Sequence, residues 1–152
     1  TDMARTIGIG KISAENQQLI DVTRQSLANA IPLLRAGNHI GDIGHAVESS
    51  IRPHGYGIVR VLVGHGVGTH VHEDPQVPNY GKAGTGLPLQ VGMVLCVEPM
   101  VNRGGDDVEF DEDDGWTVRT EDGSMSAHFE DTIAITENGP EVLTRPTDLT
   151  VL

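Results

Sequence analysis

The sequence predicts an α+β fold in which helices cover one face of a mostly antiparallel sheet. Two amphipathic helical segments come first in the chain, before any sustained strand pattern. Short β-branched and apolar segments, separated by Gly- and Pro-containing turns, make up the rest. At 152 residues the chain has the length of one domain, so we expect a single domain over residues 1–152.

Both helical segments carry start and stop signals. Ser13 is a suitable N-cap, and apolar residues recur at helical spacing from there until Gly37. Pro32 lies late in this segment and is expected to kink or tighten its last turn. A second helix is expected over residues 42–54, with an acidic residue at its start and Gly55 at its end.

The strands are expected to follow the helices. We predict them at residues 58–63, 94–100, 115–120, 126–136 and 142–143. The segment from Asp74 to Gly92 is rich in Gly and Pro and is expected to be loop. The acidic run from Asp106 to Asp114 must be a solvated loop or a hairpin tip, because burying so many like charges together is too costly.

Composition excludes several classes of protein. Lys and Arg total 10 against 22 Asp and Glu, which gives a formal net charge of −12. This charge disfavours a nucleic-acid partner and an anionic membrane surface. No apolar stretch reaches the roughly 18 residues that a membrane-spanning helix needs, and no secretory signal opens the sequence. The single cysteine, Cys96, cannot form an internal disulfide, so we expect a reducing, cytoplasmic location.

Three of the seven histidines, His65, His70 and His72, fall within eight residues. Imidazole is the commonest metal ligand and exchanges protons near neutral pH. Glycines flank His65 on both sides and would let another group approach its ring, although a tight glycine turn that merely includes a histidine fits equally well. His70 and His72 would share a face if their segment were extended, and for His70 we favour a plain exposed histidine.

Two glutamates stand in or beside apolar strand segments. An ionised carboxylate without a partner is costly to bury, so a cation or a shifted pKa is expected at Glu98. The alternative is a strand end at which Glu98 pairs with Arg103 or faces water. Glu130 belongs to the polar side of the alternating segment 126–136, which faces either solvent or a cleft.

One imidazole and several carboxylates, widely separated in sequence, form a donor set typical of a two-metal hydrolytic site. Such donors suit two divalent metal ions (Co, Mn, Fe or Zn), which lower the pKa of bound water toward ~7. No P-loop, dinucleotide fingerprint, CxxC or nucleophile-elbow motif competes with this interpretation. By themselves, Asp2 is an ordinary terminal carboxylate, and Trp116 suits either the core or a pocket rim.

Five segments carry a resemblance to one enzyme family. They are Gly64-His65-Gly66-Val67-Gly68, His72-Glu73-Asp74-Pro75-Gln76-Val77-Pro78, Val97-Glu98-Pro99-Met100, Asp114-Gly115-Trp116-Thr117-Val118 and Ser126-Ala127-His128-Phe129-Glu130-Asp131-Thr132. In this order and at these spacings, they make nearly the whole chain resemble the type I methionine aminopeptidases, which are metal-dependent enzymes of the pita-bread fold. Any one segment alone would be a weak signal.

The resemblance implies roles for particular residues. The implied metal ligands are Asp2, His65, Glu98 and Glu130, with Glu130 bridging both ions. His72 would contact the scissile peptide and stabilise the charge that develops on it. Glu98 would also shuttle a proton from the attacking water to the leaving amine. Trp116 would line the pocket for the methionine side chain.

The chain also departs from the family pattern. Family members are considerably longer, and the resemblance implies that this chain is their C-terminal part, with the N-terminal portion and its first aspartate ligand missing. His128 stands where glutamine is usual, and Asp131 stands where histidine is common. Half of a pita-bread fold would expose a large apolar face, so we expect the isolated chain to be unstable, dimeric or paired with a missing N-terminal segment or a second chain.

The resemblance implies removal of the initiator methionine from nascent proteins, with N-terminal methionyl peptides as substrates. A proline-directed aminopeptidase or dipeptidase of the same fold is the first alternative. A catalytically inactive pita-bread domain used for binding is the second, because the first aspartate ligand is absent. The physiological metal, the oligomeric state and the function of the acidic run stay open.

Overall fold

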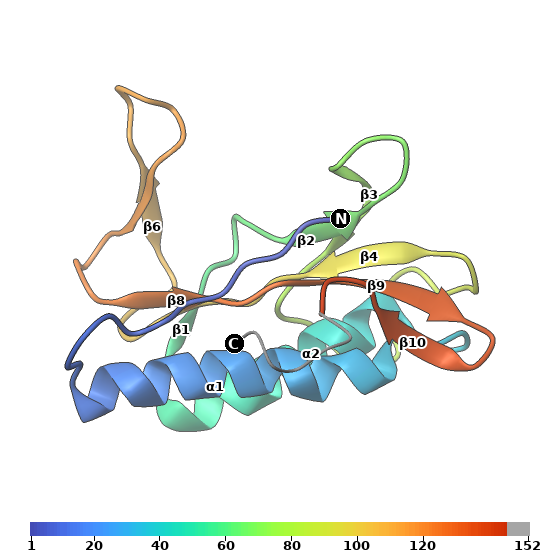
Figure 1. The fold of residues 1–152 in the computed structure, drawn as a ribbon, viewed down its shortest axis with the longest axis horizontal. Coiled ribbons are helices and arrows are strands. Elements are labelled where there is room, and N and C mark those ends of the chain that lie inside the picture. Colours follow the sequence, from blue (N-terminus) through green and yellow to red (C-terminus); the bar gives the residue numbers. More distant parts are fainter. Residues whose placement is uncertain (146–152) are drawn as a thin grey trace.

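The computed structural model describes residues 1–145 and consists of two layers (Figure 1). Two helices, α1 (Ala14–Ala30) and α2 (Ile40–Ile51), lie side by side below the strands and pack against each other. The strands form the upper layer, with the start of the chain running across it. The predicted arrangement, with helices on one face of the strands, is confirmed.

The helix boundaries follow the sequence signals closely. The Ser13 side chain accepts a hydrogen bond from the backbone N–H of Asn16, so Ser13 is the N-cap of α1 as predicted. The helix then tightens into a 3-10 turn (Ile31–Leu33) that contains Pro32. α2 begins two residues earlier than predicted, because the Asp42 carboxylate accepts the backbone N–H of His39 (2.7 Å) from within the first turn.

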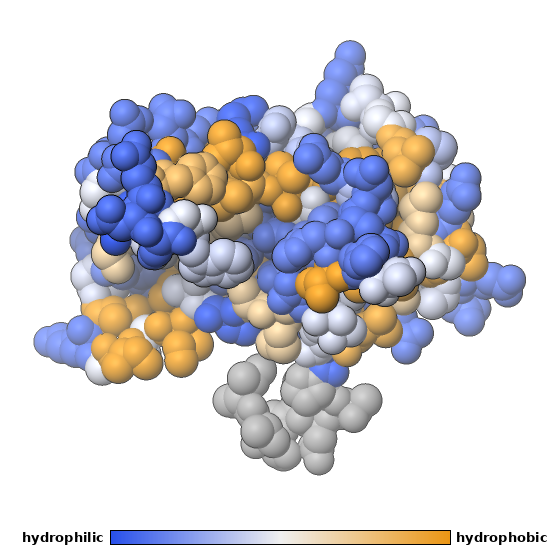
Figure 2. All heavy atoms as spheres, turned by 90° about the horizontal axis from the view of Figure 1, so that it is seen from above, coloured by the Kyte–Doolittle hydropathy of each residue, from blue (hydrophilic) through white to orange (hydrophobic). Residues whose placement is uncertain are grey.

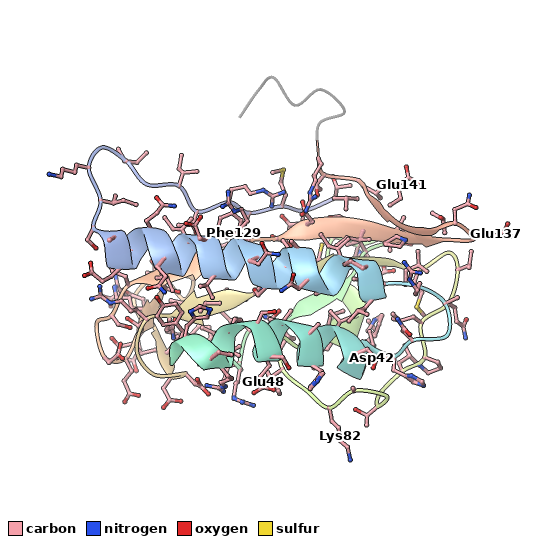
Figure 3. The ribbon with its side chains drawn as sticks, turned by 90° about the horizontal axis from the view of Figure 1, so that it is seen from below. Asp42, Glu48, Lys82, Phe129, Glu137 and Glu141 are labelled. Carbon is pink, nitrogen blue, oxygen red and sulfur yellow. The ribbon has the colours of Figure 1, made fainter. Side chains whose placement is uncertain are left out.

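The end of α2 and its contact with the neighbouring loop also fit the prediction. A 3-10 turn (Arg52–His54) continues the helix, and Gly55 ends it in the left-handed region at φ 72°. At the other end, Asp42 accepts the backbone N–H of Gly84 (2.7 Å). Figure 3 accordingly shows Asp42 at the end of α2 that faces the loop carrying Lys82.

Within residues 1–145, ten strands are paired into three antiparallel sheets. Their bounds are β1 (Gly57–Ile58), β2 (Gly64–Gly66), β3 (Glu73–Val77), β4 (Val94–Val97), β5 (Met100–Asn102), β6 (Val108–Phe110), β7 (Val118–Thr120), β8 (Ser126–His128), β9 (Asp131–Thr136) and β10 (Gly139–Val142). The strand orders are β1-β5-β8, β10-β9-β4-β2-β3 and β6-β7. Every pair within them is antiparallel.

Two chain segments pass from the five-stranded sheet into the three-stranded sheet or back, and each is interrupted where it crosses. β4 continues into β5 across Glu98-Pro99, and β8 continues into β9 across Phe129-Glu130. Because β4 pairs with β9 and β5 pairs with β8, the two interruptions lie opposite each other. The predicted strands at 94–100 and 126–136 therefore each consist of two strands with a glutamate in the gap.

Two predictions about single elements were wrong. The strand predicted at 58–63 ends at Ile58, because the chain leaves the sheet of β1 there and bends across to β2. Arg60, in the bend, forms ion pairs with Glu48 and Asp106 rather than entering a ladder. The segment from Asp74, predicted to be loop, contains most of β3. The strand was not predicted because proline is rare within strands and β3 contains Pro75.

The acidic run forms a hairpin, as predicted. β6 and β7 pair with each other and project above the upper layer (Figure 1), while residues 111–117 make the tip. Asp106 fixes the base of the hairpin by accepting hydrogen bonds from Arg52, Arg60 and the backbone N–H of Ile58.

The core lies between the helices and the strands. Its fully buried side chains come from both layers and include Leu19, Ile43, Val47, Ile51, Ile58, Leu95, Val101, Ile133 and Ile135. Figure 3 shows Phe129 beside α1, on the helix-facing side of the strands. Phe129 is 5% exposed, so the gap between β8 and β9 sends one side chain into the core.

The opposite face of the strands is mixed in character. Figure 2 shows apolar residues gathered in several patches on this face, separated by hydrophilic ones. Exposed apolar side chains include Met3, Ile7, Ile9, Val61, Val71 and Met125. The expected instability or pairing of the isolated chain stays a prediction. None of the helices in residues 1–145 combines the length and the apolar character needed to cross a membrane.

Candidate metal centre

The centre of the candidate site is His65, the middle residue of β2. Its ring is buried (8% exposed), and Gly64 and Gly66 flank it. A Cβ on Gly64 would lie 2.2 Å from the Cys96 carbonyl oxygen, and one on Gly66 would lie 2.3 Å from that of Asp74. The glycines are therefore required because the neighbouring strands approach β2 closely, so the glycine turn considered above is excluded.

The two glutamates meet His65 at the gap between the sheets. His65 Nε2 lies 3.4 Å from Glu98 Oε1 and 4.0 Å from Glu130 Oε1. His128, the last residue of β8, brings its Nε2 to 3.5 Å from Glu98 Oε2. Glu98 pairs with histidines and not with Arg103, and Glu130 is 4% exposed, so neither glutamate faces open solvent.

The start of the chain fills the gap beside Glu130. Ala4 and Glu130 exchange two backbone hydrogen bonds, of 2.9 and 3.4 Å, in an isolated antiparallel bridge. This bridge carries Asp2 to the site, where its Oδ2 lies 4.0 Å from His72 Nε2. The rings of His65 and His72 meet edge to face, with centroids 4.1 Å apart. Asp2, His65, Glu98, Glu130 and His72 are thus brought together.

Unpartnered polar atoms show that this donor set suits a cation. His65 Nε2, His128 Nε2 and Glu130 Oε1 are buried and have no hydrogen-bond partner among the described residues. An unpaired buried polar atom costs free energy, so such a cluster calls for a further group. Three sets of ligand atoms each lie within 4.8 Å of one another: Asp2/His65/His72, His65/Cys96/Glu130 and Glu98/His128/Glu130. Oxygen and imidazole donors in this arrangement fit divalent metal ions.

The electrostatics of the site also favour a bound cation. Burial, followed by the negative charges of Glu98 and Asp2, raises the pKa of the Glu130 carboxyl to about 7. Three carboxylates gathered around a buried position repel one another unless a positive charge is placed among them. Burial likewise raises the pKa of the Cys96 thiol to about 12, so Cys96 is neutral in the metal-free chain.

The site contains two residues that the sequence interpretation did not assign to it, His128 and Cys96. Both carry a period-two signal: Cys96 lies two residues before Glu98, and His128 lies two residues before Glu130. Alternation places His128 on the Glu130 side of the segment 126–136, although it assigns no role to His128 there. The same reasoning could have placed Cys96 beside Glu98, but Cys96 entered the sequence analysis only through disulfide formation.

Two residues singled out in the sequence lie outside this cluster. His70 is exposed, and residues 68–72 bend rather than extend, so His70 and His72 do not form a pair on one strand face. Trp116 is 85% exposed at the tip of the acidic hairpin, and its backbone N–H bonds Asp114. Its expected place in a methionine pocket stays a prediction.

Comparison with known proteins agrees with this geometry. The family model "Metallopeptidase family M24" matches residues 1–137. The chain belongs to the M24 metallopeptidase family. M24 relatives include a methionine aminopeptidase of Clostridium acetobutylicum, which is 50% identical over 143 residues. That alignment covers 94% of this chain and 57% of the relative.

Solved structures share the fold. The methionine aminopeptidase of Thermotoga maritima superposes with a TM-score of 0.91 at 46% identity, covering 95% of this chain and 57% of that one. A dipeptidase from Mycobacterium ulcerans is more distant, with a TM-score of 0.72 at 27% identity, and covers 98% of this chain and 35% of that one. The pita-bread fold is therefore confirmed. The chain spans a little more than half the length of the methionine aminopeptidases that it matches.

Proposed function

We propose that this chain is the catalytic C-terminal part of a metal-dependent aminopeptidase that removes the initiator methionine from nascent proteins. The observation that carries the proposal is the buried cluster of His65, Glu98 and Glu130, in which polar atoms lack hydrogen-bond partners. The higher identity to methionine aminopeptidases than to the dipeptidase supports this substrate class. Because nascent chains are the substrates, we place the protein in the cytoplasm.

Two divalent metal ions would be held by Asp2, His65, Glu98 and Glu130, with Glu130 shared between them. Co, Mn, Fe and Zn all suit carboxylate and imidazole donors. When bound, such ions lower the pKa of a water molecule toward ~7 and so supply a nucleophile at neutral pH. The chain's own contribution is to hold these donors in a largely buried site at the gap between the sheets.

Three residues would act on the substrate. Glu98, with a histidine near each carboxylate oxygen, would take a proton from the attacking water and pass it to the leaving amine. His72, whose ring is exposed above His65, would contact the scissile peptide and stabilise the developing negative charge. Trp116, on the projecting hairpin, would contact the methionine side chain.

The rest of the active enzyme would come from a segment or second chain that supplies the part of the relatives that this chain does not match. The resemblance places the first aspartate ligand there. Residues 1–152 would then act as one catalytic unit whose upper face contacts that segment. The apolar patches on that face support this arrangement (Figure 2).

The decisive experiment measures metal binding and hydrolysis of a Met-Gly peptide and an Xaa-Pro peptide, with this chain alone and after adding the unmatched part of a relative. Metal-dependent release of methionine, with or without the added part, would support the proposal. Preferential cleavage of the Xaa-Pro peptide would favour the proline-directed alternative. A chain that binds no metal and cleaves neither peptide in both conditions would be a binding module.

A further inference from the structure

We infer that Thr132 is a positioning residue, whose hydroxyl group holds Asp2 in place as a metal ligand. The inference rests on the proposed metal centre and extends it to a residue that cannot itself bind the substrate. Thr132 lies on β9 and is fully buried.

The Thr132 hydroxyl bonds both backbone groups of Asp2. It accepts the backbone N–H of Asp2 (2.8 Å) and donates to the Asp2 carbonyl oxygen (2.7 Å). The Cys96 sulfur, at 3.3 Å, is its only other partner among the described residues. A single hydroxyl thus bonds the two backbone groups that a neighbouring strand would otherwise have bonded. Among the described residues, the start of the chain forms no β-bridge other than the one between Ala4 and Glu130.

The position of Thr132 follows from strand geometry. Thr132 comes two residues after Glu130, and side chains at this spacing point to the same face. It is also paired with Cys96 across β4 and β9, beside the metal centre. The residue that fixes the backbone of Asp2 is therefore carried by the same chain segment as the ligand Glu130.

A second attachment fixes the start of the chain on the other side of Ala4. Arg5 forms an ion pair with Asp131, whose side chain is 1% exposed, and also donates to the Glu130 carbonyl oxygen. Asp131 further accepts the hydroxyl of Thr144 (2.8 Å). Ala4 is thus fixed to Glu130 and Arg5 to Glu130 and Asp131. What then remains to be fixed is the position of the Asp2 backbone, and the Thr132 hydroxyl fixes it.

The backbone of Asp2 then determines where its carboxylate points. Asp2 Oδ1 accepts the N–H of Met3 (2.9 Å), which leaves Oδ2 directed toward His72. Groups that orient metal ligands without touching the metal commonly contribute about 10- to 100-fold in metal affinity. We expect a contribution of this size from Thr132.

Thr132→Val and Thr132→Ser form a matched pair for the test, since valine keeps the shape without the hydroxyl and serine keeps the hydroxyl. The metal-free protein is titrated with Co²⁺, and binding is followed by the visible absorption of the ion. Thr132→Val should weaken binding about 10- to 100-fold and alter the absorption band. Thr132→Ser should bind like the wild type.

Thr23→Val is the control for a loss of stability. Thr23 is another fully buried threonine, and its hydroxyl donates to the Leu19 carbonyl oxygen within α1 (2.7 Å). This variant should change the free energy of unfolding while leaving Co²⁺ affinity unchanged. NMR relaxation of the metal-free Thr132→Val variant should in addition show faster motion of residues 2–3, with β9 unaffected.

The outcomes separate the inference from the proposed function. If the wild type binds no Co²⁺, the proposed metal centre fails, but the relaxation data still test whether Thr132 holds Asp2. If the wild type binds Co²⁺ and Thr132→Val binds it with equal affinity and an unchanged spectrum, the inference is overturned. Equal weakening by Thr132→Val and Thr132→Ser would also overturn it, because the hydroxyl would then not be responsible.

Discussion

His65 Nε2 lies 3.4 Å from Glu98 Oε1, but no hydrogen bond joins the two atoms. His65 instead uses its other nitrogen, Nδ1, which lies 3.0 Å from the Gly66 carbonyl oxygen. That contact suits an Nδ1–H donor and leaves Nε2 as the ring's free lone pair. An imidazole whose Nε2 has no hydrogen-bond partner and lies beside a carboxylate is arranged to bind a cation that both groups share.

The first prediction concerns this pair. His65→Ala should lower the affinity for Co²⁺ or Mn²⁺ by more than about 100-fold, because loss of a ligand exceeds the effect of losing a group that only orients one. Isothermal titration calorimetry of the metal-free protein measures it. His70→Ala is the control, since His70 is an exposed histidine of the same segment. Equal losses in both variants would show that His65 has no special role.

The second prediction concerns the stability of the metal-free protein as a function of pH. Glu130 has a pKa of about 7 in the folded chain against an ordinary value of 4.5. The folded state therefore holds a proton that the unfolded state releases between these values, and stability falls as the pH rises from 4.5 to 7. The expected loss is on the order of 3 kcal/mol.

Urea unfolding in the presence of a chelator, repeated across this pH range, measures the effect. Glu130→Gln should remove most of the pH dependence, because glutamine does not titrate. Glu137→Gln, at an exposed glutamate (Figure 3), should leave it unchanged. A Glu130→Gln profile parallel to that of the wild type would contradict the prediction.

The third prediction concerns the base of the acidic hairpin. Hydrogen bonds from Arg52, the backbone of Ile58 and Arg60 hold the pKa of Asp106 well below its usual range. Asp106→Asn should lower the free energy of unfolding by about 1–2 kcal/mol at neutral pH. Asp107→Asn, at the exposed neighbouring residue, should have little effect.

The effect of Asp106→Asn should itself depend on pH. A lowered pKa stabilises the folded state above the ordinary value of 3.8, and this contribution is lost as the pH falls through the lowered value. The difference between the wild type and Asp106→Asn should therefore shrink on acidification from about pH 6 to about pH 2. A constant difference over this range would mean that the ion pairs of Asp106 do not contribute.

Elements set by local residues could be predicted from the sequence, whereas elements set by contacts with distant parts of the chain could not. Ser13, Pro32 and Gly55 act through their own backbone, so the helices were predicted to within a few residues. The strand predicted at 58–63 failed because its β-branched residues cross from one sheet to another, a demand set by distant parts of the chain. Local propensity carries no information on such a crossing.

The candidate site likewise combines residues that the sequence could single out with an arrangement that it could not. Glu98 was recognisable because a carboxylate in an apolar strand needs an explanation, whereas the alternation around Glu130 fitted a solvent-facing side as well as a cleft. The gap between the strands, which brings the two glutamates together, could not be predicted from the sequence, because it depends on the register of β4 against β9 and of β5 against β8. Asp2 gave no signal from the residues alone, and only the family resemblance singled it out. Its place depends on the hydroxyl of Thr132 and the ion pair of Arg5.

The last prediction tests whether the close packing around β2 is needed for metal binding. A Cβ on Gly66 would lie 2.3 Å from the backbone oxygen of Asp74, which no rotation of a side chain can relieve. β3 or His65 must therefore move in Gly66→Ala. We expect a loss of about 1–3 kcal/mol in the free energy of unfolding, together with weaker Co²⁺ binding, because the ring of His65 leaves its position beside Glu98.

Gly105→Ala provides the control, because the nearest atom to its Cβ would be Asp122 Oδ2, at 4.0 Å. Chemical unfolding and Co²⁺ titration of the two variants give both quantities. If Gly66→Ala were destabilised but bound Co²⁺ as tightly as the wild type, the glycine would serve packing alone. Joint loss of stability and affinity, absent in Gly105→Ala, would mean that the fit of β2 between β3 and β4 fixes the position of the metal ligand His65.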